Sequence, residues 1–274
     1  MTDADTPPLE TGWLATTPVE DSYLRRFLWN WAEANAAAVS AFGGHVRNTP
    51  AVRMADAGRP VVFANCATLT QPLTAATVGA TLAQIGAFYD FDDPARLGEV
   101  LLISAWPTGD LRPFGWTLMG HPPLQLLPPG VPARPSPAGL TVQRVTTLEQ
   151  LHAWERTVIH GYPLEGLEEA PAGALISPSL LADPRYGAWV GYAGGVPVAA
   201  SAAWVEFGVV NVTLVATLPD ERRKGYGEAL TWAASRLDPT LPAMLVSSDD
   251  GRPVYERMGY LPLNRMTFWY RGRP

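Results

Sequence analysis

Residues 216–230 read ATLPDERRKGYGEAL and contain the turn that decides the fold of the chain. The preceding residues 209–218 are apolar and rich in β-branched side chains, which predicts a strand. Three consecutive cations and two glycines follow, and a helix is expected over residues 222–237. Free backbone N–H groups and the dipole at the start of a helix favour anions. The sequence therefore predicts a strand, a sharp turn and a helix that together bind an anion.

Two common phosphate motifs do not fit this turn. A P-loop needs Lys after its last glycine, where Glu228 stands instead. A dinucleotide-binding fingerprint needs a third glycine at the position of Leu230. The pattern that fits is Arg-x-x-Gly-x-Gly, formed by Arg222, Gly225 and Gly227. On these residues the chain resembles the GCN5-related N-acetyltransferases, which bind the pyrophosphate of acetyl-CoA with this pattern.

The resemblance implies a set of residues that bind acetyl-CoA. The turn would hold the pyrophosphate, with Arg223 and Lys224 attracting the 3′-phosphate end. The backbone at the end of the preceding strand would pair with the pantetheine arm. The cofactor-binding residues implied in this way are Val215, Ala216, Thr217, Arg222, Arg223, Lys224, Gly225, Tyr226 and Gly227.

A second motif supplies a candidate for the chemistry. Residues 247–260 read SSDDGRPVYERMGY, in which Pro253 suits the first turn of a short helix and Gly259 ends it. The family carries a Tyr on this helix before a Gly-aromatic pair, and Tyr255 matches it. A phenol beside the thioester sulfur can donate a hydrogen bond or a proton to the leaving thiolate. The alternative is that Tyr255 only packs the helix.

The general base is less clear. Some members of the family have a Glu where Asn211 stands, and an amide cannot act as a base, although it can hold a water. Glu206 is the nearest carboxylate in the sequence, and it could equally be an exposed hairpin charge. Three further glutamates could attract a cationic acceptor or lie in a solvated loop, and three aromatic residues could line the acceptor site or belong to the core. These are Glu165, Glu168 and Glu169, and Trp154, Tyr162 and Trp204.

Composition limits the partners. The 274 residues carry a net charge of −6 with a pI near 5.2, which disfavours nucleic acid. A single cysteine, Cys66, and four scattered histidines predict no disulfide and no metal site. The weakly charged residues 194–218 are interpreted as two strands rather than a membrane span, because they contain Pro197 and Gly208. Since residues 1–10 do not resemble a secretory signal, we expect a cytoplasmic protein without a membrane partner.

A proline-rich stretch divides the chain into two predicted domains. Residues 127–139, LPPGVPARPSPAG, are interpreted as a linker between domains at 1–134 and 139–274. The first half contains helix patterns at 21–42 and 74–89 and strand patterns at 59–68 and 99–106, but no Arg-x-x-Gly-x-Gly. We interpret the first half as an α/β domain, for which a degenerate acetyltransferase-like domain is one interpretation. Its expected role is to complete the acceptor pocket or an interface. The sequence leaves a homodimer open.

The second half predicts the element order β-α-β-β-β-α-β-α-β. This is a layered α/β arrangement, and it matches the acyl-CoA N-acyltransferase fold, a mixed, mostly antiparallel sheet flanked by helices. The resemblance, over about residues 140–271, implies an N-acetyltransferase that transfers an acetyl group from acetyl-CoA to a primary amine of a small molecule or protein. Direct attack in a ternary complex is expected, because Cys66 lies in the other half. The alternative is a catalytically silent CoA-binding regulatory module.

Overall fold

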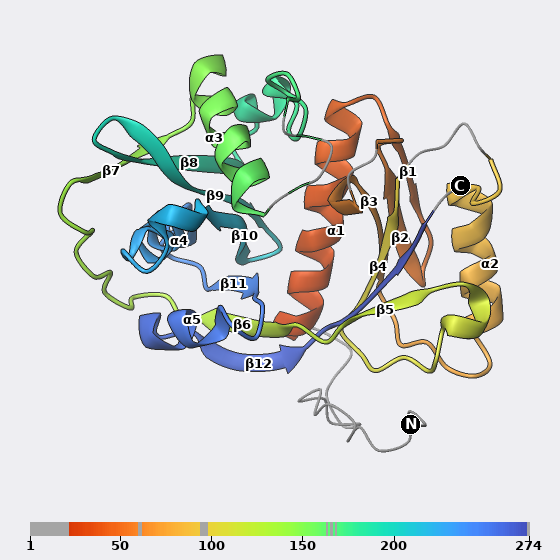
Figure 1. The fold of residues 1–274 in the computed structure, drawn as a ribbon. Helices are drawn as coiled ribbons and strands as arrows, with labels where there is room; N and C mark the ends of the chain where they lie inside the picture. The colour runs from red at the N-terminus through yellow and green to blue at the C-terminus, as the bar shows by residue number, and fades with distance from the viewer. Residues whose placement is uncertain are drawn as a thin grey trace, which may run out of the picture.

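The computed structural model describes residues 22–59, 62–93, 98–162, 164, 167 and 169–272. It confirms a mixed α/β fold, in which two mostly antiparallel sheets are flanked by helices (Figure 1). The first sheet has the order β1-β2-β3-β4-β13-β5 and the second has the order β12-β6-β11-β10-β9-β8-β7. No helix in the described part of the chain is long and apolar enough to cross a membrane.

The strands of the first sheet are β1 (His45–Asn48), β2 (Val52–Asp56), β3 (Asn65–Leu69), β4 (Val100–Ser104), β5 (Thr117–Gly120) and β13 (Thr267–Arg271). Those of the second are β6 (Pro123–Leu127), β7 (Leu140–Arg144), β8 (Tyr186–Ala193), β9 (Val196–Glu206), β10 (Val209–Thr217), β11 (Ala243–Val246) and β12 (Leu261–Arg265). The helices are α1 (Tyr23–Ala41), α2 (Val78–Tyr89), α3 (Leu148–Gly161), α4 (Tyr226–Ser235) and α5 (Arg252–Met258), with 3-10 turns η1 (Val62–Ala64), η2 (Arg112–Phe114), η3 (Pro178–Ala182) and η4 (Pro219–Glu221).

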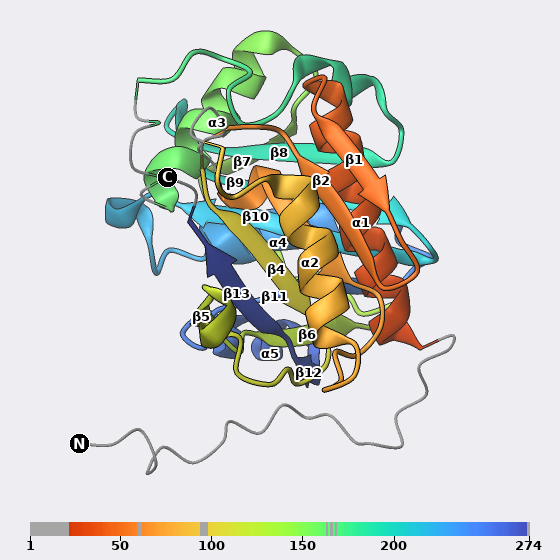
Figure 2. The ribbon, with the colours of Figure 1, turned by 90° about the vertical axis from the view of Figure 1, so that its right-hand side faces the viewer.

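Helix α1 lies between the two sheets and belongs to the cores of both (Figures 1 and 2). Its start is capped by the Ser22 hydroxyl, which accepts from the Arg25 N–H at 3.3 Å. Phe27 and Leu28 are fully buried against strands of both sheets. Helix α2 covers the other face of the first sheet, whereas α3 joins α1 on one face of the second sheet and α4 covers its opposite face. The layers therefore run α2, first sheet, α1 with α3, second sheet, α4.

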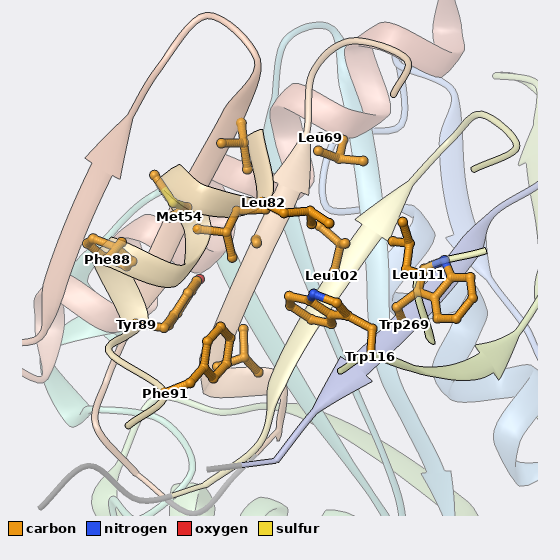
Figure 3. Close-up of a cluster of buried hydrophobic side chains, with 14 residues drawn as sticks. Met54, Leu69, Leu82, Phe88, Tyr89, Phe91, Leu102, Leu111, Trp116 and Trp269 are labelled. Carbon is orange, nitrogen blue, oxygen red and sulfur yellow. The ribbon is translucent and has the colours of Figure 1, made fainter. Parts of the chain in front are cut away.

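The face of the first sheet under α2 is closely packed (Figure 3). Leu102 and Trp269 point from the sheet into this cluster, and Tyr89 reaches it from α2. The polar atoms of the two aromatic residues have partners, because Trp269 Nε1 donates to Thr108 Oγ1 at 2.9 Å and Tyr89 Oη donates to the Ala55 carbonyl at 3.1 Å. This face has the character of a structural core.

The two sheets share one plan. Within the described residues each has one parallel pair, β3 with β4 and β10 with β11, and each pair is joined by a helix, α2 or α4. Each half also places its last strand in the sheet of the other half. Strand β13 lies between β4 and β5, and β6 lies between β11 and β12. The division at residues 134–139 stays a prediction, and two strands cross it.

Three elements differ from their expected bounds. Helix α4 begins at Tyr226 rather than at residue 222, because Arg223 (φ 65°) and Gly225 (φ 81°) have left-handed backbones that a helix cannot include. The last strand of the predicted order corresponds to β13, which begins at Thr267, and a separate strand that was not predicted, β12, ends just before it at Arg265. Strand β6 was not predicted, because prolines disfavour a strand. Pro123, however, is its first residue, a position that tolerates proline. Residues 1–21, Glu165 and Glu168 lie outside the described residues.

Candidate functional site

The two strands beside α4 separate along their length. Strand β10 pairs with β11 only where Val210 and Asn211 lie opposite Ala243 and Met244, yet β10 continues to Thr217. A β-bulge between Thr213 and Ala216 bends β10. At its centre Leu214 has φ 51°, an uncommon conformation for a side chain of this size. The bulge therefore turns the second part of β10 away from β11 and leaves one edge of it without a strand partner.

Side chains already contact this free edge. The Tyr162 hydroxyl donates to the Val215 carbonyl at 2.9 Å. Arg222 donates from Nε to the Thr217 carbonyl at 3.3 Å and from Nη2 to the Gly161 carbonyl at 3.0 Å, so its guanidinium joins the end of α3 to the end of β10. Of the three predicted pantetheine residues, Val215 and Thr217 are contacted in this way, and Ala216 is buried and pairs with Ala200 of β9.

The loop of residues 222–227 leads into an open helix start. The N-cap of α4 is Gly225, so no side chain caps the helix, and its first backbone N–H groups keep their capacity to bind an anion. Gly227 packs close to β10, since a Cβ there would lie 3.1 Å from Thr217 Oγ1. Lys224 forms an ion pair with Glu221 at 2.9 Å on the surface. Loop geometry and charge together fit a phosphate-bearing group.

Tyr255 lies on α5, near the opening between β10 and β11, and lines the same cavity as Val215. Its ring packs edge-on against Tyr260, with centroids 5.8 Å apart. Burial raises the pKa of Tyr255 to about 12, and a hydrogen bond with the Thr231 hydroxyl acts in the opposite direction. The phenol therefore keeps its proton throughout the neutral range.

Asn211 is buried in β10, directly opposite Trp204 of β9. Its Oδ1 has no hydrogen-bond partner among the described residues. Because a buried amide oxygen normally has a partner, this atom is a candidate to bind a ligand or water. Asn211 and Thr213 share one face of β10, and both line a cavity.

A cavity of about 470 Å³ brings several predicted residues together. Val215, Asn211, Tyr255, Tyr162 and Trp204 all line it.

Other predicted residues lie elsewhere. Glu206 does not line the cavity; it forms an ion pair with Arg185 at 3.1 Å and accepts from Trp204 Nε1 at 3.1 Å. Trp154 is a core residue whose Nε1 donates to the Ser201 carbonyl at 2.8 Å. Glu169 is exposed and is not among the residues that line the cavity. No cluster of His, Cys, Asp or Glu suited to a metal occurs among the described residues.

The sequence predicted that the first half completes the acceptor pocket or an interface, but it did not identify the residues that form this wall of the cavity. The wall includes Trp31 of α1, Phe42 at the C-cap of α1, Phe63 of η1 and Leu101 of β4. In the sequence these residues have only the periodicity of an ordinary core. The sequence indicated only that the two halves contact each other, and it did not identify the residues that make the contact.

Comparison with solved structures decides the fold family. A GCN5-related N-acetyltransferase from Kribbella flavida matches with a TM-score of 0.64 and 24% sequence identity, over 89% of this chain and 95% of its own. The chain has the GCN5-related N-acetyltransferase fold. This fold also matches a GNAT-family protein from Novosphingobium aromaticivorans (TM-score 0.58, 16% identity, 93% of this chain and 100% of that one). A GCN5-related N-acetyltransferase from Sphaerobacter thermophilus matches at 0.52, with 14% identity over 82% of this chain and 78% of that one.

The GCN5-related likeness covers nearly the whole chain in the first two of these structures, not only residues 140–271, where the sequence carries the resemblance. No protein-family model matches the sequence. No curated protein matches it either. The structural likeness therefore rests on the arrangement of elements, with little identity in sequence.

Proposed function

We propose that this protein is an acyl-CoA-dependent N-acyltransferase that transfers an acetyl group from acetyl-CoA to a primary amine, by direct attack in a ternary complex. The observation that supports it is the continuity of the site: the uncapped start of α4 packs against the end of β10, where a Cβ at Gly227 would lie 3.1 Å from Thr217 Oγ1. The same part of β10 reaches the cavity through Val215, and Tyr255 lines that cavity too. The GCN5-related fold supports the expectation of acetyl transfer, and these residues are the proposed site for it.

Each part of the site has a proposed role toward acetyl-CoA, which supplies a thioester. The N–H groups at Gly225, Tyr226 and Gly227 bind the pyrophosphate, because glycines let the backbone approach and the helix dipole favours the charge. Arg223 and Lys224 attract the 3′-phosphate. The free edge at Val215, Ala216 and Thr217 pairs with the pantetheine amides.

Arg222 positions this part of the site in addition to contacting the anion. Its two hydrogen bonds to the Thr217 and Gly161 carbonyls hold the end of β10 against α3.

Tyr255 stabilises the leaving group. The amine nitrogen forms a bond to the acyl carbon, the carbon–sulfur bond breaks, and the sulfur leaves with the bonding electron pair. A free thiol has a pKa near 8.5, well below the value of about 12 for Tyr255. The phenol therefore donates a hydrogen bond to the developing thiolate and keeps its own proton. The proton lost by the amine passes to water.

Asn211 is proposed to position the amine or a water through its unpartnered Oδ1. It cannot remove a proton, so the amine attacks in its neutral form. Glu206 is occupied by Arg185 and Trp204, and we propose that it orients the Trp204 ring instead of acting as the base.

Acetylation assays test this proposal. Acetyl-CoA is incubated with a panel of primary amines, and both free thiol and the acetylated amine are measured. We expect turnover with at least one amine and a large loss of turnover in Tyr255→Phe, with CoA affinity by calorimetry unchanged. Tyr270→Phe, on β13 outside the cavity lining, is the matched control and should behave as the wild type. Tight CoA binding without acetylation of any amine would instead support a silent CoA-binding module.

A further inference from the structure

The cavity beside Tyr255 extends into the space between the two sheets, well beyond the opening between β10 and β11. Helix α1 forms one wall of this inner part, where Ala34 and Ala38 leave room. Aromatic and aliphatic side chains of the first half complete the wall, among them Trp31, Phe42 and Leu101. The volume of about 470 Å³ is in the range of small-molecule sites.

The lining of the cavity is mostly apolar, and its described residues include no charged side chain: none is an Asp, Glu, Lys, Arg or His. The carboxylate of Glu155, which is outside the lining, acts on the Tyr186 end and already accepts from three backbone N–H groups. An ammonium group moved next to Asn211 therefore loses hydration without gaining a counter-charge from the lining, so burial lowers the pKa of a bound amine and favours its neutral form. A polycation would bury several such charges. The cavity therefore suits a ligand that has a single amino group on an apolar skeleton. Because these surroundings favour the neutral, nucleophilic amine, no carboxylate base is needed.

Three residues form a row across the floor of the cavity. Tyr186 of β8 lies opposite Trp204 of β9, and Trp204 lies opposite Asn211 of β10. Residues opposite one another in a sheet share a face, and all three line the cavity.

The two ends of this row are polar and unsatisfied. Tyr186 and Asn211 are 6% and 2% exposed, and neither the Tyr186 hydroxyl nor Asn211 Oδ1 has a hydrogen-bond partner among the described residues. Leaving such buried groups unpaired destabilises the folded protein. An acyl chain would satisfy neither of them. A ligand with a polar group at each end and an apolar ring between them would satisfy both.

We propose that this cavity is the acceptor site and that it binds an arylalkylamine, with the amine at Asn211, the ring over Trp204 and a second polar group at Tyr186. Two strand spacings separate the ends of the row, about 10 Å at the backbone. This length suits one aromatic ring with a short aminoalkyl chain. The chemical step rests on the proposed acetyl transfer, whereas binding of the amine does not.

Binding is tested without turnover through Cys66, the only cysteine of the chain. The expectation that Cys66 lies away from the site was wrong, because it lines the same cavity; burial raises its pKa to about 11, which keeps the thiol protonated and still favours direct attack by the amine. The reaction of Cys66 with methyl methanethiolsulfonate is followed by mass spectrometry at pH 9, with and without tyramine. We expect tyramine to slow the reaction at least fivefold and spermidine to leave it unchanged. Equal protection by spermidine, or none by tyramine, would overturn the proposal.

Specificity is tested by narrowing the cavity. Ala38→Leu places a larger side chain in the wall, and Ala34→Leu does so one turn away and serves if the first variant folds poorly. The matched control is Ala36→Leu, also on α1 but outside the lining. We expect at least a tenfold fall in kcat/KM for tyramine, with ethylamine within twofold, and no change in the control.

Two outcomes separate this proposal from the proposed function. If tyramine protects Cys66 but no amine is acetylated, the assignment of an arylalkylamine-binding site stands and the proposed acetyl transfer fails. If amines are acetylated while Ala38→Leu changes only the preference between acetyl-CoA and octanoyl-CoA, the cavity holds the acyl chain and the acceptor assignment is overturned.

Discussion

The crossovers β3-α2-β4 and β10-α4-β11 occupy equivalent places in the two sheets, and only the second is open. Strand β3 has five residues and three of them pair with β4, so the strands stay together. Strand β10 leaves β11 after Asn211 because of the bulge at Leu214. The loop before α2, residues 70–77, contains no Arg or Lys, whereas the loop before α4 has three consecutive cations. One bulge and one basic turn thus distinguish the crossover that is proposed to bind CoA from the closed one.

The largest effect is expected in the closed crossover. Leu102 of β4 is fully buried under α2, and Leu102→Ala removes apolar contacts and leaves a cavity (Figure 3). We expect the free energy of unfolding to fall by about 2–5 kcal/mol. Urea denaturation measures this change, and calorimetry at a temperature where the variant is folded should give unchanged CoA affinity. A loss of CoA affinity in the folded variant would mean that the closed crossover takes part in binding.

Tyr255→Phe tests the open crossover with the next largest effect. Removing one hydroxyl that stabilises the leaving group should lower kcat about 100-fold, which corresponds to about 2.7 kcal/mol. Stability and CoA affinity should stay close to the wild type. If kcat falls by less than threefold, Tyr255 only packs against Tyr260 and the leaving group needs another donor.

Gly225→Ala tests whether the start of α4 binds CoA and the equivalent start of α2 does not. Gly225 has φ 81°, and an added Cβ would lie 3.1 Å from Pro137 Cγ, so alanine strains the loop by about 1–2 kcal/mol. We expect the Kd for CoA to rise about tenfold. Gly79→Ala, in the first turn of α2, is the control, because nothing lies within 4 Å of its added Cβ. Equal effects of the two variants on CoA binding would remove the distinction between the crossovers.

The pH dependence of turnover should show a smaller effect. Burial raises the pKa of Tyr255 to about 12 from the ordinary value near 10, so the phenol stays protonated where a free one ionises. With saturating acceptor, kcat should not decline between pH 9 and 10.5. Because the pKa of Tyr255 is higher in the folded state than in the unfolded state, its contribution to the free energy of unfolding is fully present below pH 10. This contribution is lost as the pH rises toward 12. A decline in kcat centred near pH 10 would contradict a buried, protonated Tyr255.

Glu206→Gln is expected to have the smallest effect. The carboxylate is paired with Arg185 and lies outside the cavity lining, so kcat should stay within about twofold of the wild type. A pH–rate profile of the variant provides the check. A loss of turnover by 100-fold or more, with loss of an acidic limb in the profile, would restore Glu206 as the general base.

The sequence predicted the second half of the fold well, because its signals are local. The turn at Pro219 to Gly227 and the helix before Gly259 depend on glycine and proline, whose backbone preferences act within a few residues. The predicted helices at 21–42 and 74–89 correspond to α1 and α2, and the first helix of the order predicted for the second half corresponds to α3, because helical periodicity is also a local signal. The exchange of β6 and β13 could not be predicted, because strand pairing between distant segments has no local signal.

The residues of the candidate site also fall into two groups, those that the sequence predicts and those that only the structure identifies. Arg222, Gly225 and Tyr255 form motifs in the sequence, and they can be selected without coordinates. The bulge at Leu214 has no glycine or asparagine to mark it, since Leu itself adopts the left-handed backbone. The row of Tyr186 and Trp204 depends on the register of three strands, which only the structure provides.

The reciprocal placement of β6 and β13 has a consequence for how the protein folds during synthesis. Residues 267–271 follow every other strand in translation, yet they fill an interior position of the first sheet. That sheet therefore lacks a strand until the second half has been made, and the second sheet needs β6 from the first half. Neither half can complete its hydrogen bonding alone, so the two should fold in one cooperative transition dominated by long-range contacts. Such a chain exposes unpaired strand edges late in synthesis, when chaperones would have most to protect.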